Sequence, residues 1–177
     1  MKAWVYEDYG CVNVLKFDSN VAVPDVEARV LIKVVSAALN QVDAKRRHGK
    51  FKATHYPLPN VPACDVAGVG LKAGCQVRTL KWEMKYMGNI NEKARESPKQ
   101  FGSLAEYTTV EEKLLAPKPK NLDFVRATGL PLVIETAYEG LERTGFSSGK
   151  SILVLNGAGG VGSLIIQVFT LQQMRHF

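Results

Sequence analysis

The chain has 177 residues, slightly more than the roughly 150 residues of a typical single domain. Its composition of 46% hydrophobic and 23% charged residues is sufficient for a buried core and excludes a disordered, collagen-like or disulfide-stapled chain. The three cysteines are an odd number and form no C-x-x-C pair, so we expect reduced thiols. No apolar stretch approaches the roughly 18 residues of a membrane span, and the N-terminus has no apolar signal region. These features predict a soluble, intracellular protein.

Lysine and arginine outnumber aspartate and glutamate by 23 to 17, which gives a net charge of +6. The densest basic segment is Lys45–Lys52, and such a segment is also typical of a short nucleic-acid-binding patch or a localisation signal. No zinc-finger, RRM or helix-turn-helix motif accompanies it. We therefore expect a solvated helix end and loop here, and no nucleic-acid partner.

The first half of the chain has the pattern of short strands separated by turns. The clearest strand is Arg29–Ala38, whose nearly continuous apolar and β-branched residues predict burial on both faces. A polar helical turn is expected at Gln41–Arg47, and the prolines of residues 57–62 predict an extended surface loop. Further strands, which complete a compact β-rich domain, are expected at Lys2–Tyr6, Val66–Leu71, Gln76–Leu80 and Ala105–Val110.

The second half of the chain changes to a helical period after a proline-containing connector at 113–120. Apolar residues from Leu130 to Leu141 recur at helical spacing with charged residues between them, which predicts an amphipathic helix. Pro131 suits its first turn and Gly145 its C-terminal cap. A short apolar strand is then expected at Ser151–Leu155, followed by a glycine-rich turn and a last helix with Val161, Leu164, Ile165 and Val168 on one side.

The glycine-rich turn matches G-x-G-x-x-G through Gly157, Ala158, Gly159, Gly160, Val161 and Gly162. Its place between an apolar strand and a helix predicts a dinucleotide-binding turn, because glycines let backbone N–H groups approach a pyrophosphate at a helix N-terminus. An ordinary glycine-rich strand-to-helix loop is the alternative. No Lys-Ser or Lys-Thr follows, which excludes a triphosphate-binding P-loop. The acidic residue that reads the ribose is expected about 20 residues further on, beyond Phe177, so these residues do not distinguish NADPH from NADH.

Several segments in a fixed order resemble the zinc-free quinone oxidoreductase branch of the medium-chain dehydrogenase/reductase superfamily. The resemblance is strongest to a plant group of 2-methylene-furan-3-one reductases, alkenal/enone reductases and chloroplast-envelope quinone oxidoreductase homologues. It implies a mixed α/β fold, in which a GroES-like β-rich domain precedes the first βα unit of an incomplete Rossmann domain. We expect the domains at 1–120 and 121–177. The segments that carry the resemblance are Met1–Trp4, Val30–Asp43, Phe101–Tyr107, Leu130–Tyr138 and the turn Ala158–Gly162.

The resemblance implies a function and roles for single residues. Members transfer hydride from NADPH to an enone, an enal or a quinone without a metal. Asn40 and Lys45 are expected near the substrate carbonyl, and Thr136 near the nicotinamide carboxamide. The pyrophosphate is expected on Gly157, Gly159, Gly160, Val161 and Gly162. The alternatives are that Asn40 only caps the following turn, that Lys45 is a solvated lysine, and that Thr136 is ordinary helix surface.

No metal site is expected. Cys64-Asp65 stands where zinc-dependent relatives have a Gly-His-Glu region, and it lacks an adjacent histidine. His48 and His55 have no second ligand at a metal-like spacing, and we interpret Cys64 as a small buried hydrophobic residue.

The chain also departs from the family pattern. Gln41 replaces a proline, Ala63-Cys64 replaces Gly-Tyr, and the segment 81–88 lacks a Gly-Asp turn. One strand and one helix cannot form a doubly wound sheet, so we expect a C-terminally truncated chain. The alternative function is therefore an inactive GroES-like fragment that acts as a non-catalytic interaction module. Full-length relatives are expected to be monomers or homodimers, and self-association of this chain is left open. We expect a cytoplasmic location, with the chloroplast envelope or stroma as the alternative.

Overall fold

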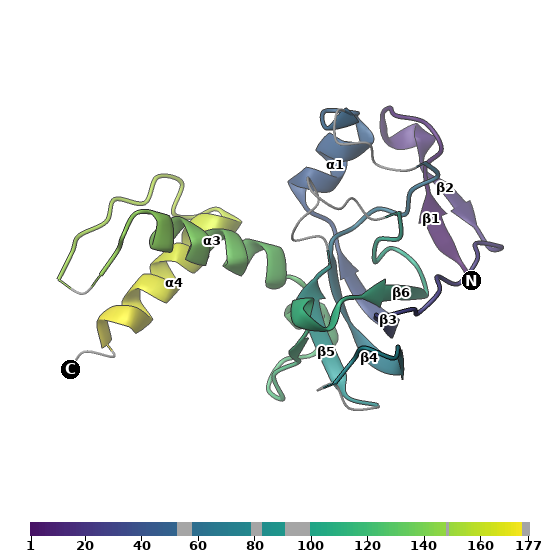
Figure 1. Cartoon of the computed structure of the whole chain (residues 1–177). Coiled ribbons are helices and arrows are strands. Elements are labelled where there is room, and N and C mark those ends of the chain that lie inside the picture. Colours follow the sequence, from purple (N-terminus) through teal and green to yellow (C-terminus); the bar gives the residue numbers. More distant parts are fainter. Residues whose placement is uncertain (53–57, 79–82, 91–99, 148, 175–177) are drawn as a thin grey trace. The chain divides into compact units, whose positions relative to one another are not determined.

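The computed structural model describes residues 1–52, 58–78, 83–90, 100–147 and 149–174, with side chains as far as Leu171 (Figure 1). The chain forms two compact units, Met1–Gly129 and Leu130–Phe177. The expected boundary at residue 120 lies before helix α2 (Phe124–Thr128), which contacts strands of the first unit and belongs to it. The Thr128 hydroxyl donates to the Ser36 carbonyl at 3.3 Å, which joins the end of α2 to the sheet.

The first unit contains two antiparallel sheets. The smaller sheet pairs β1 (Ala3–Val5) with β2 (Lys16–Asp18), and the larger has five strands in the order β6-β3-β4-β5-β7. Figure 1 shows how the strands of the larger sheet lie side by side. Its strands are β3 (Val30–Ala38), β4 (Asp65–Ala73), β5 (Lys85–Asn89), β6 (Tyr107–Val110) and β7 (Ala116–Pro117). Helix α1 (Gln41–Arg47) follows β3. Two short 3-10 helices, Val12–Val14 and Glu112–Leu114, lie between β1 and β2 and between β6 and β7.

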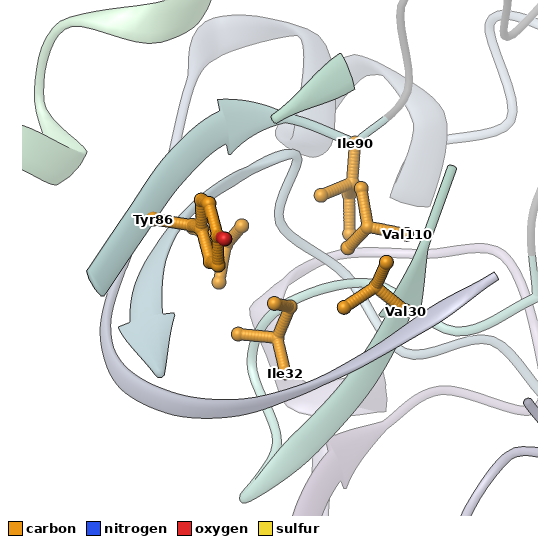
Figure 2. Close-up of a cluster of buried hydrophobic side chains, with 6 residues drawn as sticks. Val30, Ile32, Tyr86, Ile90 and Val110 are labelled. Carbon is orange, nitrogen blue, oxygen red and sulfur yellow. The ribbon is translucent and has the colours of Figure 1, made fainter. Parts of the chain in front are cut away.

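The core of the larger sheet consists of apolar side chains from four strands and the residue after β5 (Figure 2). Burial of each valine or isoleucine side chain stabilises the fold by about 1.5–3 kcal/mol. β-Branched residues dominate here because they pack well on the pleated surface of a strand. Figure 2 shows Tyr86 of β5 turned toward the same interior as Ile32 of β3. The members of this cluster are Val30, Ile32, Val66, Tyr86, Ile90 and Val110.

Most elements expected in the first half are confirmed, and two expectations about its strands are wrong. Strand β3 is not buried on both faces, because Lys33 and Val35 are exposed between buried or half-buried neighbours. Gln76–Arg78 forms a turn and irregular backbone, in which the Val77 N–H donates to the Gly74 carbonyl at 3.2 Å. The rest of that expected strand, residues 79–80, lies outside the described residues.

The proline segment differs from the expected surface loop at its C-terminal end. Asn60 and Val61 are buried, at 2% and 4% exposure. Asn60 exchanges two backbone hydrogen bonds with Tyr6, at 2.9 and 3.0 Å, and the Val61 N–H donates to the Gln100 carbonyl at 2.9 Å. These long-range backbone partners draw the segment into the fold, although Pro57 itself lies outside the described residues.

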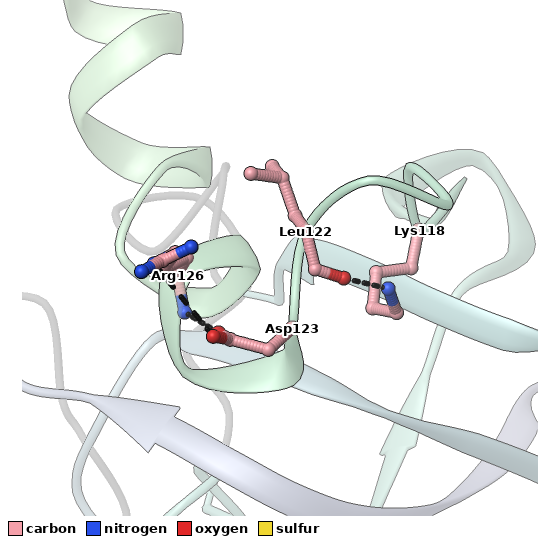
Figure 3. A network of polar contacts seen from close by, with 4 residues as sticks. All are labelled: Lys118, Leu122, Asp123 and Arg126. Carbon is pink, nitrogen blue, oxygen red and sulfur yellow. Dashed lines mark hydrogen bonds and ion pairs between the residues drawn. The ribbon is translucent and has the colours of Figure 1, made fainter.

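Helix α2 begins at a side-chain cap, and a lysine fixes the loop before it (Figure 3). The Asp123 carboxylate accepts the Arg126 backbone N–H at 2.7 Å, as is typical of an N-cap aspartate. The Lys118 ammonium donates to the Leu122 carbonyl. Local chemistry is therefore sufficient to place the start of α2.

The second unit consists of α3 (Pro131–Arg143) and α4 (Gly160–Met174), which contact each other. Pro131 occupies the first turn of α3 as expected. Gly145 follows the C-cap with φ +60°, and the N–H groups of Gly145 and Phe146 donate to the carbonyls of Glu142 and Leu141, which is a Schellman motif. The rings of Phe146 and Phe169 lie 5.0 Å apart, which joins the end of α3 to α4.

The expected strand Ser151–Leu155 is wrong. The structure gives these residues no strand hydrogen bonds, and Leu153 and Leu155 are 84% and 82% exposed. A strand exists only where a neighbouring strand accepts its ladder of hydrogen bonds, and among the described residues no segment pairs with this one.

Candidate functional site

Asn40 lies at the junction of β3 and α1, where it is the N-cap residue of the helix. Its backbone N–H donates to the Asp43 carboxylate at 2.7 Å, and the Asp43 N–H donates back to the Asn40 carbonyl at 3.0 Å. Its side-chain amide donates to the carboxyl of Asp65 at 2.8 Å. Asn40 is therefore the N-cap residue of α1, and its side chain also contacts strand β4.

A buried polar cluster lies directly beside Asn40. The Cys64 thiol donates to the Asp43 carboxylate at 3.1 Å, and the Arg46 guanidinium donates to the Cys64 sulfur at 2.9 Å. Cys64 is 1% exposed, so its burial is confirmed, but its sulfur is a member of a hydrogen-bonded network and not simply an apolar filler. Helix α1 and the segment that leads into β4 supply these side chains.

Burial dominates the electrostatics of this cluster. Burial raises the pKa of the Asp43 carboxyl, and hydrogen bonds from Asn40, Cys64 and the Ala63 backbone, with the nearby Arg46 charge, offset part of that rise. Burial also raises the pKa of the Cys64 thiol, and the adjacent Asp43 charge adds to the rise. Cys64 therefore stays a neutral thiol at ordinary pH and is a poor nucleophile or metal ligand.

Next to this cluster the surface has a small pocket. It is lined by the cluster residues Asp43 and Arg46, by Tyr6, and by the segment Asn60–Ala63. Asp43 and Tyr6 are almost completely buried, whereas Arg46 is half-buried. The pocket therefore lies beside the hydrogen-bonded cluster of Asp43, Cys64 and Arg46.

Lys45 is exposed on α1, and no described hydrogen bond or ion pair involves its ammonium group. Its neighbours in the basic segment have structural contacts: the Arg47 side chain donates to the Gly10 carbonyl at 3.4 Å, and Lys52 lies 4.9 Å from the centre of the Tyr9 ring. The basic segment up to Lys52 is thus a helix end and turn on the surface.

The glycine-rich turn lies in the second unit and depends on close backbone contacts. Asn156 has φ +57°, and its carbonyl accepts the Gly159 N–H at 2.9 Å. A Cβ on Gly162 would collide with that same carbonyl oxygen, and a Cβ on Gly159 would lie 2.6 Å from the Asn156 side-chain nitrogen. A Cβ on Gly160 would meet no atom nearer than Val133 Cγ1, at 3.7 Å. Backbone packing therefore requires glycine at 162, whereas a side chain at 159 needs only a shift of the Asn156 side chain and a small adjustment of its carbonyl. Helix α4 begins at Gly160.

Thr136 is exposed on α3, and its hydroxyl donates to the Leu132 carbonyl one turn earlier at 2.7 Å. This bond is common for helical threonines and needs no ligand. Thr136 and the glycine-rich turn lie in the second unit, whereas Asn40 and Lys45 lie in the first.

Sequence reasoning missed Asp43 and the carboxyl of Asp65 as hydrogen-bond partners of Asn40. Asp43 could have been found, because an acidic residue three positions after an N-cap asparagine has capping-box spacing. Asp65 lies 25 positions further along the chain, so no local pattern indicates it. In the part of the chain that the structure describes, no group of three or more His, Cys, Asp or Glu residues could hold a metal ion, and no helix is long and apolar enough to cross a membrane.

Comparison with known proteins places these features in context. Residues 26–120 match the model of the alcohol dehydrogenase GroES-like domain. The chain is 70% identical over 169 residues to the "NADPH-dependent alkenal/one oxidoreductase, chloroplastic" of Arabidopsis thaliana, and equally to the "2-methylene-furan-3-one reductase" of Solanum lycopersicum. Each match covers 95% of this chain and 44% of the relative, so the chain spans less than half the length of these curated relatives.

The structure is also similar to solved structures. The quinone oxidoreductase from Coxiella burnetii superposes with a TM-score of 0.85 at 29% identity, over 98% of this chain and 54% of that chain. An alcohol dehydrogenase superfamily protein from Novosphingobium aromaticivorans gives a TM-score of 0.86 at 31% identity, over 97% of this chain and 51% of that chain.

Proposed function

The chain belongs to the alcohol dehydrogenase GroES-like domain family, and on that premise we propose that it is the N-terminal part of an NADPH-dependent reductase of activated alkenes or quinones. The 70% identity to two plant enone reductases over 169 residues carries this proposal. The expected resemblance to the quinone oxidoreductase branch and the expected mixed α/β fold with a GroES-like β-rich domain are confirmed. The "chloroplastic" name of the Arabidopsis relative supports a plastid location, with the cytoplasm as the alternative.

The glycine-rich turn fits a dinucleotide. Glycine at 159 and 162 keeps the turn compact, and the N-terminus of the 15-residue helix α4 supplies a partial positive charge. We propose that Gly157, Gly159, Gly160, Val161 and Gly162 hold the pyrophosphate, and that Thr136 contacts the nicotinamide carboxamide. NADPH, when bound, supplies the hydride.

In the first unit, we propose that Asn40 and Lys45 bind the substrate. The fixed position of Asn40 at the N-cap of α1 suits a side chain that orients a carbonyl group. The exposed ammonium of Lys45, on the same helix, can donate to a carbonyl oxygen or a cofactor phosphate. Polarisation of the carbonyl makes the β-carbon of an enone more electron-poor, so this reaction needs no metal.

Two variants at Gly160 test the cofactor site. Position 160 has room for a side chain, so Gly160→Asp and Gly160→Asn are both expected to fold. They are nearly identical in shape, and only aspartate places a negative charge beside the phosphates. We expect the Asp variant to bind NADPH about tenfold or more weakly than the Asn variant, as measured by cofactor fluorescence.

Turnover of 2-cyclohexenone with NADPH tests whether this chain itself carries out the reaction. Equal NADPH binding by the two Gly160 variants contradicts the assignment of the turn, and no turnover by the unmodified chain contradicts reductase activity of this chain. The second candidate, a non-catalytic interaction module, rests on the exposure of Leu153 and Leu155, which offer an apolar contact surface.

A further inference from the structure

The side chain of Asn40 is held by a residue from another strand. Asp65 is the first residue of β4, and the antiparallel register places it opposite Ala38, two positions before Asn40. The Asp65 side chain is fully buried, and one of its carboxyl oxygens accepts the Asn40 amide at 2.8 Å. The sheet register thus brings a buried carboxyl to a side chain that the proposed function places at the substrate carbonyl.

The backbone of Asn40 is fixed separately from its side chain. The Asp43 carboxylate accepts the Asn40 backbone N–H at 2.7 Å, and Asp43 is itself 6% exposed. Two buried acidic residues from different elements therefore hold one residue, Asp43 through the main chain and Asp65 through the amide. This arrangement leaves the Asn40 side chain little freedom to rotate.

The chemistry of the carboxyl determines which way the amide faces. The Asn40 amide nitrogen, and not its oxygen, faces Asp65, and a carboxyl oxygen of Asp65 accepts its N–H at 2.8 Å. An amide nitrogen carries two N–H groups. In the part of the chain that the structure describes, the Asn40 amide donates to no residue other than Asp65. One N–H is consequently left to donate elsewhere.

We propose that Asp65 is a positioning residue that orients the Asn40 amide so that its remaining N–H donates to the carbonyl oxygen of the bound enone or quinone. The inference rests on the proposed function and deepens it. The accepting Asp65 oxygen favours a single amide orientation, because the reverse orientation would place the Asn40 amide oxygen against that acceptor oxygen.

Three variants of the full chain separate positioning from structure. Asp65→Asn keeps the shape but lets either group of residue 65 face Asn40, so the orientation is no longer enforced. The exchange Asn40→Asp with Asp65→Asn retains an N–H···O bond but reverses it, so position 40 offers a carboxylate and no N–H. Ser103→Ala is the matched control, because it removes a buried bond of 2.6 Å to the backbone carbonyl of Asp65 and leaves the carboxyl untouched.

The expected turnover results differ among these variants. We expect Asp65→Asn to lower kcat/KM for 2-cyclohexenone about tenfold or more, as loss of a preorganised donor does. The exchange variant is expected to regain the unfolding midpoint in urea without regaining turnover. Ser103→Ala is expected to unfold more easily and keep kcat/KM. Wild-type kcat/KM in Asp65→Asn, or recovery of turnover in the exchange variant, overturns the proposal.

A second readout does not depend on turnover. With ¹⁵N-labelled asparagine, 2-cyclohexenone without cofactor should shift the Asn40 side-chain amide signals in the wild type and in Ser103→Ala, and should not do so in Asp65→Asn. If this shift occurs and the wild type reduces no enone, the proposed function fails and the positioning role of Asp65 is supported. If the enone leaves the Asn40 amide signals unmoved in the wild type, the positioning role fails.

Discussion

Gly162→Ala is expected to destabilise the second unit, although alanine is the better helix former. A Cβ at 162 would collide with the Asn156 carbonyl oxygen and would lie 2.9 Å from Gly157 Cα. Both neighbours are backbone atoms of the glycine-rich turn, so relief requires that the turn itself shifts. Overpacking of this kind costs about 1–3 kcal/mol.

Gly140→Ala is the matched control because it lies in the neighbouring helix α3 and its added Cβ would meet no atom within 4 Å. Both substitutions gain the same helix propensity, about 0.8–1 kcal/mol. The propensity cancels in the comparison, so the free energy of unfolding of Gly162→Ala should lie about 1–3 kcal/mol below that of Gly140→Ala.

Urea unfolding followed by circular dichroism measures this difference. Hydrogen exchange locates it: the Ser163 amide, which donates to the Gly159 carbonyl at 2.9 Å, should lose protection in Gly162→Ala and keep it in Gly140→Ala. Equal unfolding free energies, or unchanged exchange at Ser163, would refute the close backbone contact at Gly162.

Two further predictions concern titration and association. Burial raises the folded-state pKa of Asp43, so its favourable contribution to stability is fully present below the unfolded pKa of about 4 and is lost as the pH rises through the higher folded value. The unfolding free energy of the wild type should thus fall relative to Asp43→Asn as the pH rises above about 4, and a pH-independent difference in urea titrations would contradict this. Leu153 is 84% exposed, so Leu153→Lys should reduce concentration-dependent self-association in sedimentation velocity, whereas equal sedimentation of both proteins would exclude this contact.

The sequence alone located the elements that depend on near neighbours along the chain. The helical turn Gln41–Arg47 has the observed bounds of α1, and Pro131 and Gly145 mark the start and end of α3. These signals are reliable because capping hydrogen bonds join residues three to five positions apart. Asn40 was also identified at the sequence level as a candidate substrate-binding residue, through the family resemblance, and this role stays a proposal.

The tertiary structure decided the features that depend on distant partners. The bond from Asn40 to Asp65 spans 25 positions and exists because the β3–β4 register places Ala38 opposite Asp65. From the sequence we interpret Cys64 as a small buried hydrophobic residue. In the fold its sulfur instead forms hydrogen bonds with both Asp43 and Arg46. Ser151–Leu155 has the composition of a strand and is not one, since a strand needs a hydrogen-bonded neighbour that no local pattern provides. Local pattern thus fixed the helix ends, and pairing between distant segments decided which polar groups surround Asn40.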